Sequence, residues 1–461
     1  MASSPPEVKS PRHWLMGPAY YAQRQPLKWI PKWIEEHGDI FTVSSPLGRA
    51  TVIARPEWAR HVLVDHYSRY QRKSQAYQVL RILFGNGLVT SEGEFWRGQR
   101  KLIQPAFHRQ RLELIFSMML NRTMDCGQRL AETAGRRQAL DLGPLLSQLT
   151  LDIIARAMFG TEVEGAAAEV SRHIALLNEY ALHLLRHPWL FLVPRRFPTP
   201  LNYRQYHALH ALNRIVLGII RARRHAPARH DDLLAMLLAA CEEETGRGMS
   251  DDQLRDEVMT IFVAGHETTA NAMCWLIHLV SQHPEVEEKM WAELDSAWAD
   301  GSLTPERIGR LTYTRQVVEE SLRVYPTIWS IGRRCSERDE IGGFQIPEAM
   351  NVVVPIFHFH WHERYWPEPR RFDPERFAPN RRPGAEEMTY FPFGAGPRSC
   401  IGNAFALQEL LIMTAIFHRH FAFRVEPGFK VEAEPLITLR PKHGMKMLVQ
   451  LRQAPNDPAH R

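Results

Sequence analysis

Hydrophobic residues recur at helical spacing through most of the chain, most clearly between Leu112 and Arg247. Runs such as LELIFSMML and LLSQLTLDIIARAMFG repeat apolar residues at this spacing, which predicts amphipathic helices. The segment 187–202, HPWLFLVPRRFPTPLN, is rich in proline and therefore interrupts the helical pattern. Alternating or β-branched runs are short and few. The pattern predicts a mainly α fold with small β-sheets.

Two short β regions are predicted. The runs FTVSS (41–45) and ATVIA (50–54) are separated by turn residues at 46–48, which indicates a hairpin. A second pair of short strands is expected on either side of Gly342 and Gly343. Both regions are small beside the helical part of the chain.

The longest predicted helix begins at Ser250, which can cap its first turn. Asp251 and Asp252 suit the positive end of the helix dipole, and the apolar pattern continues to a stop at Pro284. A helix of this length can cross the whole protein. It is therefore expected to be central to the fold.

The composition is that of an ordinary globular protein. The chain has 461 residues, of which 44% are hydrophobic and 23% charged. No Gly/Ser linker, low-complexity tract or internal repeat divides it, so one domain over 1–461 is predicted. Within it we expect an N-terminal extension (1–25), a body (26–450) and a C-terminal tail (451–461). The N-terminus has no apolar run long enough for a signal peptide or membrane span, so a soluble, cytoplasmic protein without a transmembrane anchor is expected.

The formal net charge is +6, but basic and acidic residues are interleaved along the chain. No nucleic-acid-binding motif is present, so no nucleic-acid partner is expected, and we interpret the positive balance as a docking face for an acidic protein. The cysteines are scattered and contain no C-x-x-C pair, which fits a reducing compartment and indicates neither a disulfide framework nor a zinc knuckle. They are Cys126, Cys241, Cys274, Cys335 and Cys400.

The strongest chemical signal lies at residues 393–402, FGAGPRSCIG. Cys400 follows two glycines, Gly394 and Gly396, and precedes a helical run beginning at Asn403. A lone cysteine is more often a small buried apolar residue. Here, however, the glycines allow a flat ligand to approach, and a helix N-terminus favours thiolate. The loop therefore indicates a metal ligand or a nucleophile.

This loop resembles the haem-binding signature of the cytochrome P450 family. The pattern F-x-x-G-x-R-x-C-x-G is matched by Phe393, Gly396, Arg398, Cys400 and Gly402. The resemblance implies a haem b whose iron is bound by the Cys400 thiolate, with Phe393, Arg398 and Gly402 as further cofactor contacts. It also implies an α+β fold with a triangular helical body and a long central helix over the haem.

Residues 264–269 of the long helix, AGHETT, are similar to the family pattern A-G-x-E-T-T. The resemblance implies that Thr268 hydrogen-bonds dioxygen and a water, and that Glu267 relays protons. Ala264, together with Gly265, is expected to let the flat cofactor lie against the helix. His266 falls at the variable position, and we interpret it as structural.

Trp96 and Arg100 lie four residues apart, on one face of a helix that is expected to begin near Glu92. Alone, this spacing is more typical of a surface arginine beside a buried tryptophan. Next to the cysteine loop it resembles the family's propionate-binding helix, in which both side chains hydrogen-bond a haem carboxylate. By position in the family pattern, Arg333 is expected to be a second propionate contact, with Arg334 as the weaker candidate.

His360 stands where the family commonly has a histidine at the haem edge. With His358 and His362 it forms a cluster that also suggests a metal site. The spacing fits residues at a strand edge equally well, and the resemblance argues against zinc.

Glu320 and Arg323 are spaced i, i+3, and the run FDPERF at 372–377 follows them. Such a pair is usually a solvated surface ion pair. The resemblance instead implies an internal triad of Glu320, Arg323 and Arg376 that holds the cysteine loop in place.

The residues expected to line the substrate pocket are mostly apolar and include no charged anchor. This favours a lipophilic substrate such as a terpenoid, carotenoid, steroid or fatty acid. By resemblance, the segment 187–202 lies near the roof of the substrate channel, where residues 189–192 would touch a lipid surface or cap the core. The pocket candidates are Tyr77, Leu83, Leu88, Leu184, Trp329, Ile331, Leu436 and Ile437.

Together these motifs imply a haem-thiolate monooxygenase that inserts one atom of O2 into an unreactive C–H or C=C bond. The chain contains no G-x-G-x-x-G or flavin-binding segment after Cys400, so electrons from NAD(P)H must arrive through a separate ferredoxin or flavodoxin and its reductase. Basic residues are candidates for docking that partner, although they also fit a solvated charge run. They are Arg97, Arg100, Lys101 and Arg109.

Two alternatives remain. An enzyme of the same fold could use peroxide directly or rearrange a peroxide in its substrate, but such relatives usually lack the acid and the alcohol that Glu267 and Thr268 supply. A non-enzymatic haem-thiolate sensor would need no proton relay.

Overall fold

The computed structural model describes residues 3–11, 13–14, 16–45, 48–134, 138–160, 167–187, 190, 197, 199–225, 232–240, 246, 248–298 and 303–452. Helices make up most of this part of the chain. They are α1 (Ala19–Arg24), α2 (Pro26–His37), α3 (Pro56–Arg60), α4 (Gln75–Phe84), α5 (Gly93–Ile103), α6 (Arg109–Ala134), α7 (Leu142–Phe159), α8 (Ala167–Arg186), α9 (Pro200–His225), α10 (Leu233–Ala239), α11 (Asp251–Ser281), α12 (Pro284–Ala297), α13 (Pro305–Arg310), α14 (Thr312–Val324), α15 (Ile356–Trp361) and α16 (Asn403–His420).

The strands are short. They are β1 (Ile40–Ser45), β2 (Gly48–Ile53), β3 (Tyr70–Gln71), β4 (Ala139–Asp141), β5 (Ile331–Cys335), β6 (Asp339–Ile341), β7 (Phe344–Ile346), β8 (Asn351–Val354), β9 (Phe421–Val425), β10 (Ala433–Pro435), β11 (Leu439–Pro441) and β12 (Lys446–Leu451). In the described residues, the largest sheet has the order β1-β2-β8-β5-β3.

The predicted hairpin and the second strand pair are both present. β1 pairs antiparallel with β2, from Ile40 opposite Ile53 to Ser45 opposite Gly48. β6 pairs antiparallel with β7 across Gly342 and Gly343, both of which have positive φ angles that favour glycine.

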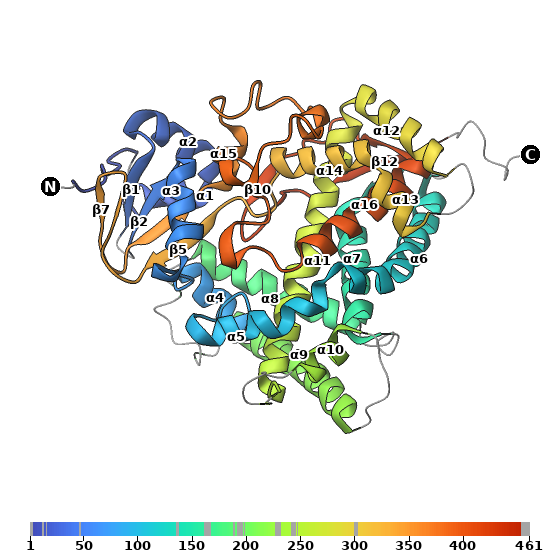
Figure 1. The fold of residues 1–461 in the computed structure, drawn as a ribbon, viewed down its shortest axis with the longest axis horizontal. Helices are drawn as coiled ribbons and strands as arrows, with labels where there is room; N and C mark the ends of the chain where they lie inside the picture. The colour runs from blue at the N-terminus through green and yellow to red at the C-terminus, as the bar shows by residue number, and fades with distance from the viewer. Residues whose placement is uncertain are drawn as a thin grey trace, which may run out of the picture.

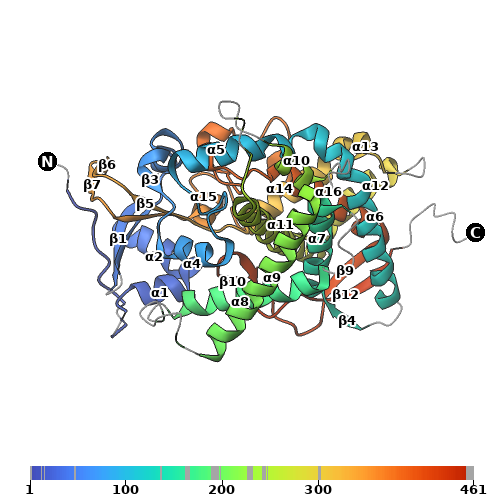
Figure 2. The same ribbon diagram turned by 90° about the horizontal axis from the view of Figure 1, so that it is seen from below.

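The body has a broadly triangular outline (Figure 1), with the large sheet at the N-terminal end and α9 and α10 at the lower corner. Seen from below, α8 and α9 lie side by side in front of α11 (Figure 2). The α+β fold class with a helical body, predicted from the sequence, is confirmed.

The long helix α11 is central, as predicted. Ser250 caps it, because its hydroxyl accepts a hydrogen bond from the Gln253 N–H at 3.2 Å. From Ala270 to Ser281 the helix is apolar on almost every face and almost entirely buried, as expected for a helix surrounded by protein. It packs against α7, α9, α14 and α16.

The N-terminal segment, which was expected to be an extension, packs against the sheet in the part described. Val8 is buried, and its N–H donates to the Thr42 carbonyl at 3.0 Å. The Thr42 N–H in turn donates to the Pro6 carbonyl at 2.8 Å. These residues therefore pair with the edge of β1 and contribute to the core beside α2.

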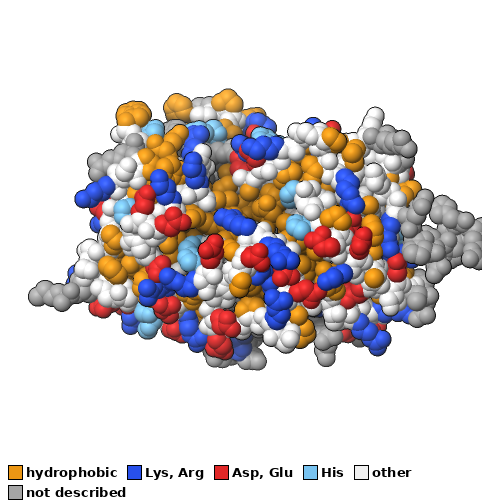
Figure 3. Space-filling view, turned by 90° about the horizontal axis from the view of Figure 1, so that it is seen from above, with side chains coloured by type: hydrophobic (Ala, Val, Ile, Leu, Met, Phe, Trp, Pro, Cys, Tyr) orange, Lys and Arg blue, Asp and Glu red, His pale blue; other side chains and the backbone are white. Residues whose placement is uncertain are grey.

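The surface carries charges of both signs. On the face drawn in Figure 3, basic and acidic side chains alternate around a hollow where hydrophobic side chains gather. Among the described residues, no helix is both long enough and apolar enough to cross a membrane.

Candidate active site

The loop that carries Cys400 is built on its own backbone hydrogen bonds. The Cys400 N–H donates to the Phe393 carbonyl at 2.9 Å, and the Ser399 N–H donates to the Gly396 carbonyl at 2.9 Å. Gly396 has a φ of 69°, and a Cβ atom there would lie 2.1 Å from the Leu63 carbonyl oxygen. Only glycine fits this position, so the loop is docked against the segment that follows α3.

The Cys400 side chain is exposed, yet protein atoms surround the sulfur closely enough that burial raises the pKa of the thiol. The Gly402 N–H, Arg100 and Arg72 each act to lower this pKa, but they do not outweigh burial. The expectation that the loop alone favours thiolate was therefore wrong. A bound metal cation would deprotonate the thiol outright.

On α11, Ala264 is exposed although most of the helix is buried. Thr268, one turn further on, is partly exposed, and its hydroxyl donates to the Ala264 carbonyl at 2.6 Å. Gly265 serves another purpose than expected. A Cβ atom there would lie 3.2 Å from the Ile154 side chain, so this glycine allows α11 to pack closely on α7.

Glu267 faces away from the Thr268 hydroxyl. One carboxylate oxygen accepts a hydrogen bond from the Asn178 amide at 2.9 Å, and the other accepts one from the Thr438 hydroxyl at 2.9 Å. The Asn271 amide donates to the same Thr438 hydroxyl at 3.2 Å. Residues of α8, α11 and the β10–β11 turn therefore hold this carboxylate.

A cavity of about 590 Å³ opens beside Glu267. Many of its lining side chains are polar, including His183 and Arg440, and Glu267 is part of its wall. His266, also in this wall, is buried, and its Nδ1 lies 3.0 Å from the Phe262 carbonyl. Burial lowers the pKa of His266, in keeping with the structural role expected for it.

Arg398 of the cysteine loop stacks on Trp96 of α5, with the guanidinium carbon 3.8 Å from the ring centre. It forms an ion pair with Glu92 at 2.7 Å, and burial lowers the pKa of Arg398 to about 9. Arg100 donates to the Ser399 carbonyl at 2.8 Å. The residues predicted to contact a haem carboxylate therefore meet at the cysteine loop.

Arg333 joins the same cluster. It is buried, it donates to the Tyr77 hydroxyl at 3.3 Å, and burial lowers its pKa to about 10. Tyr77, predicted to line the substrate pocket, lies between Arg333 and Arg72. The pKa of its hydroxyl falls although burial acts to raise it, because these cations are close.

Arg72 was not found from the sequence. It donates to the Arg398 carbonyl at 3.0 Å and to the Val89 carbonyl at 3.1 Å, and its backbone N–H donates to Glu92. The Nε atom of Arg72 is buried and has no hydrogen-bond partner among the described residues. No local pattern could have revealed this residue or Glu92, because their contacts join positions up to 326 residues apart.

These residues suit a haem. Among the described residues, the only carboxylate that forms an ion pair with a guanidinium of this cluster is that of Glu92, which binds Arg398, so positive charge is in excess in a partly buried region. The two carboxylates of a haem would balance it. The exposed Cys400 and the small, exposed Ala264 also suit an iron and the flat face of a porphyrin, respectively.

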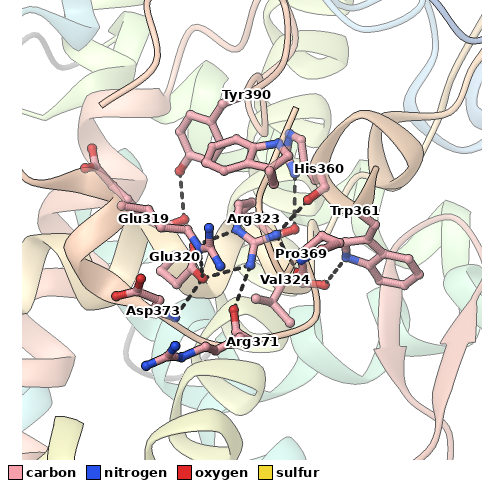
Figure 4. Close-up of polar contacts among 12 residues, drawn as sticks. Glu319, Glu320, Arg323, Val324, His360, Trp361, Pro369, Arg371, Asp373 and Tyr390 are labelled. Carbon is pink, nitrogen blue, oxygen red and sulfur yellow. Dashed lines mark hydrogen bonds and ion pairs between the residues drawn. The ribbon is translucent and has the colours of Figure 1, made fainter. Parts of the chain in front are cut away.

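The three residues of the predicted triad are buried, and Figure 4 shows Glu320 beside Arg323. Arg323 is fully buried and binds Glu320 through two hydrogen bonds, of 2.6 and 2.8 Å. Arg376 lies 3.5 Å from Glu320, which also accepts the Asp373 N–H at 2.9 Å. Burial raises the pKa of Glu320, although Arg323 acts to lower it.

The Arg323 guanidinium also joins separate segments of the chain. It donates to the carbonyls of His360, Pro369 and Arg371 at 2.7 to 3.1 Å (Figure 4). One buried side chain therefore ties α14 to α15 and to the loop that leads toward Cys400.

His360 does not have the environment expected of a residue at the haem edge. It is fully buried, with Nδ1 3.3 Å from the Arg323 carbonyl, and its Nε2 accepts the Phe391 N–H at 3.2 Å. Burial and the nearby Arg323 lower the pKa of His360 to about 3. Both ring nitrogens are used, so His360 connects the triad to the start of the cysteine loop.

The histidine cluster gives no support to a metal site. Among the described residues, no group of three or more histidine, cysteine, aspartate or glutamate side chains could hold a metal ion. His358 is buried, and burial lowers its pKa to about 3.

Some pocket candidates are apolar residues in the interior or near the cysteine loop. Ile331 lies close to the cysteine loop, since a Cβ atom on Gly394 would be 3.6 Å from its Cδ1. Leu88 and Leu184 are buried apolar residues. The side chain of Leu83 lies outside the described residues, as do residues 189 and 191–192 of the expected channel roof.

Three further pocket candidates, Trp329, Leu436 and Ile437, lie at or beside the β10–β11 turn. The Trp329 indole donates to the Leu436 carbonyl at 2.8 Å, which fixes the β10–β11 turn against the segment before β5. Ile437 borders the cavity beside Glu267.

The basic residues suggested for partner docking have different surroundings. Arg100 turns into the cysteine loop, and Arg97 pairs with Glu94. Lys101 is exposed, and the side chain of Arg109 lies outside the described residues.

Comparison with known proteins identifies the family to which the chain belongs. The cytochrome P450 family model matches residues 6–448. The chain is 34% identical to cyclooctat-9-en-7-ol 5-monooxygenase of Streptomyces melanosporofaciens, over 90% of this chain and 88% of that protein. It is 32% identical to cyclooctatin synthase of the same organism, over 93% and 94%. It is 30% identical to pentalenene oxygenase of Streptomyces avermitilis, over 92% and 93%. The chain therefore belongs to the cytochrome P450 family, the haem-thiolate monooxygenases.

Proposed function

We propose that this monooxygenase hydroxylates or epoxidises a lipophilic terpenoid, with electrons supplied by a separate ferredoxin or flavodoxin. Relatives named for cyclooctat-9-en-7-ol, cyclooctatin and pentalenene support the terpenoid class. The apolar side chains of Leu88, Leu184 and Ile331 suit such a substrate, and also a carotenoid, steroid or fatty acid. The observation that carries the proposal is the exposed Cys400 on its glycine loop, together with Thr268 and Glu267 on α11.

In this proposal Cys400 binds the iron of a haem, and the arginine cluster holds the haem carboxylates. The side chains of Arg333, predicted as a propionate contact, and Arg398, predicted as a cofactor contact, are largely buried, so both gain from a carboxylate partner. Trp96 supports the guanidinium of Arg398 from one side. A haem with a thiolate ligand supplies the oxidising chemistry that favours O–O cleavage.

Thr268 and Glu267 of α11 take part in proton transfer. Thr268 holds a proton on Oγ1, which points at the Ala264 carbonyl, and rotation of its side chain redirects that proton toward the cofactor side of the helix. Glu267 meets the polar cavity, where water can supply protons. Its hydrogen-bond donors, Asn178 and Thr438, are neutral, so water can replace them at modest cost.

The overall reaction balances. One oxygen atom of O2 enters a C–H or C=C bond of the substrate, and the other leaves as water after two electrons and two protons are taken up. The electrons come from the redox partner, and the protons reach the site through Glu267 and Thr268.

Oxygen labelling tests this proposal. The purified protein, a surrogate ferredoxin with its reductase, and NAD(P)H would be incubated under labelled O2 with a panel of terpenoids, steroids and fatty acids. One labelled oxygen atom in a terpenoid product is the expected result. Product formed from peroxide alone, with none from O2 and reductant, would instead support the peroxide-using alternative.

A further inference from the structure

The turn between α4 and α5, residues 85–88, rests directly on α11. The Asn86 N–H donates to the Asp256 carboxylate at 2.7 Å, and the Leu88 N–H donates to the Glu257 carboxylate at 2.9 Å. Consecutive acidic residues of one helix therefore bind alternate backbone N–H groups of the turn. These are charge-assisted bonds, the stronger kind, whenever the carboxylates are ionised.

Glycines bring this turn close to the helix. Gly85 has a φ of 68°, and a Cβ atom there would lie 2.2 Å from an Asp256 carboxylate oxygen. A Cβ atom on Gly87 would lie 2.2 Å from the Thr260 hydroxyl and 2.6 Å from the Asp256 carbonyl oxygen. The turn can keep this contact only with glycine at both positions.

The turn is also tied to its own flanking segments. The Thr90 hydroxyl donates to the Gly85 carbonyl at 2.7 Å, and Arg81 donates to the Asn86 side chain at 2.7 Å. These bonds hold the turn to its flanking segments, and its backbone N–H bonds to Asp256 and Glu257 connect it to α11.

This contact is costly for the fold. Glu257 is fully buried, and among the described residues its second carboxylate oxygen has no hydrogen-bond partner. The Thr260 hydroxyl is buried and likewise has no partner in the part of the chain that the structure describes. Apolar side chains would fill these positions at lower cost, so core stability alone does not account for them.

The geometry places this contact on the reaction side of α11. Glu257, Ala264 and Thr268 are separated by seven and four residues, so they lie along one face of the helix. Leu88, the last residue of the turn, is buried beside Glu257 and is a candidate wall residue of the substrate pocket.

We propose that Asp256 and Glu257 are positioning residues that hold the 85–88 turn, and so set where Leu88 stands in the substrate pocket. They act as specificity-determining residues for lipophilic ligands without touching them. The inference rests on the proposed function, because it takes Leu88 as part of the pocket wall.

The test uses the haem-loaded protein and three variants. Glu257→Leu removes the acceptor, Glu257→Gln keeps an acceptor oxygen, and Gly87→Ala pushes the turn off the helix. Asp252→Leu, an exposed acidic position on the same helix, is the control. Each protein is first checked for the spectrum of its reduced, carbon monoxide-bound form, which tests the proposed function separately.

Two readouts follow in proteins that pass this check. Hydrogen exchange of peptides covering residues 84–90 reports whether the turn is held. Imidazole, 4-phenylimidazole and clotrimazole bind haem iron and differ in size. Their affinities, measured by optical titration, report how large a ligand the pocket accepts. We expect Glu257→Leu and Gly87→Ala to speed exchange and to change the ratio of clotrimazole to imidazole affinity by about tenfold.

Glu257→Gln and Asp252→Leu should stay within about twofold of the parent protein in both readouts. The proposal is overturned if Glu257→Leu and Gly87→Ala retain slow exchange and an unchanged affinity ratio. It is also overturned if Glu257→Gln changes both readouts as much as Glu257→Leu does, because the backbone acceptor would then be irrelevant. If Glu257→Leu does not fold, the hydrogen exchange and the affinity ratios of Gly87→Ala and Glu257→Gln still test the proposal.

Discussion

At the scale of single residues, the orientation of Glu267 is the feature with the most direct chemical consequence. Its carboxylate is held by the neutral donors Asn178 and Thr438 rather than by a cation. Thr268, the next residue, points its hydroxyl at the helix backbone. Proton transfer between the two therefore requires side-chain rotation, and the donors of Glu267 set its starting position.

Removing one donor should disturb proton delivery. We predict that Asn178→Leu lowers the product formed per reductant consumed severalfold and raises peroxide release, because Glu267 is no longer held beside the cavity. Product, reductant and peroxide would be measured in the same incubation. Ser147→Ala, a change in the cavity wall, is the control. Unchanged coupling in Asn178→Leu would show that this hydrogen bond does not matter for turnover.

Glu257 should give stability a characteristic pH dependence. Burial raises its pKa from an ordinary 4.5 to about 8. Between these values the unfolded chain has lost the proton that the folded protein keeps, so this residue's contribution to stability is largest below pH 4.5 and is lost as the pH rises toward 8. Relative to Glu257→Gln, the parent protein should lose about 2 kcal/mol of unfolding free energy between pH 6 and pH 8.

Urea unfolding of both proteins across this pH range would measure the effect. Asp256 and Arg255 are present in both, so their contributions cancel in the difference. A difference that does not vary with pH would mean that Glu257 is ionised in the folded protein.

At the scale of elements, the Glu320–Arg323 pair joins α14 to the segments that support the cysteine loop. Arg323 is fully buried and donates hydrogen bonds to the Glu320 carboxylate and to the carbonyls of His360, Pro369 and Arg371. His360 continues this connection to Phe391, just before the loop. The triad is therefore linked to the haem-binding loop through His360 as well as through the chain itself.

Breaking this connection should be severe. Arg323→Ala leaves the buried Glu320 carboxylate unpaired, which is expected to cost about 3–5 kcal/mol. The melting temperature and the haem content of the purified protein would both fall. Arg371→Ala is the matched control, because its side chain is exposed and its pair with Glu368 should be worth less than about 1 kcal/mol. Equal melting temperatures for Arg323→Ala and the parent would contradict this account.

At the scale of the whole molecule, local patterns in the sequence predicted local features well. The Ser250 cap, the β1–β2 hairpin and the i, i+3 pair of Glu320 and Arg323 depend on neighbours close in sequence. Contacts across long separations left no such pattern. Glu92 with Arg398 is an example, since the two residues are 306 positions apart.

The same reason explains why the contacts of some predicted site residues could not be foreseen. His360 and Tyr77 occupy suitable positions in the sequence, but their partners come from segments that only the folded chain brings near. Gly265 was expected to face a cofactor and instead allows α7 to approach, because one helix has several faces and the sequence does not show which neighbour covers each.

The most direct test of the central claim is the optical spectrum of the reduced, carbon monoxide-bound protein beside its Cys400→Ser variant. Cys126→Ser, which changes a buried cysteine elsewhere, is the control. We predict a strongly red-shifted Soret band in the parent and in Cys126→Ser that is lost in Cys400→Ser. A band that is absent from the parent, or that persists without Cys400, would contradict the assignment of Cys400 as the thiolate ligand.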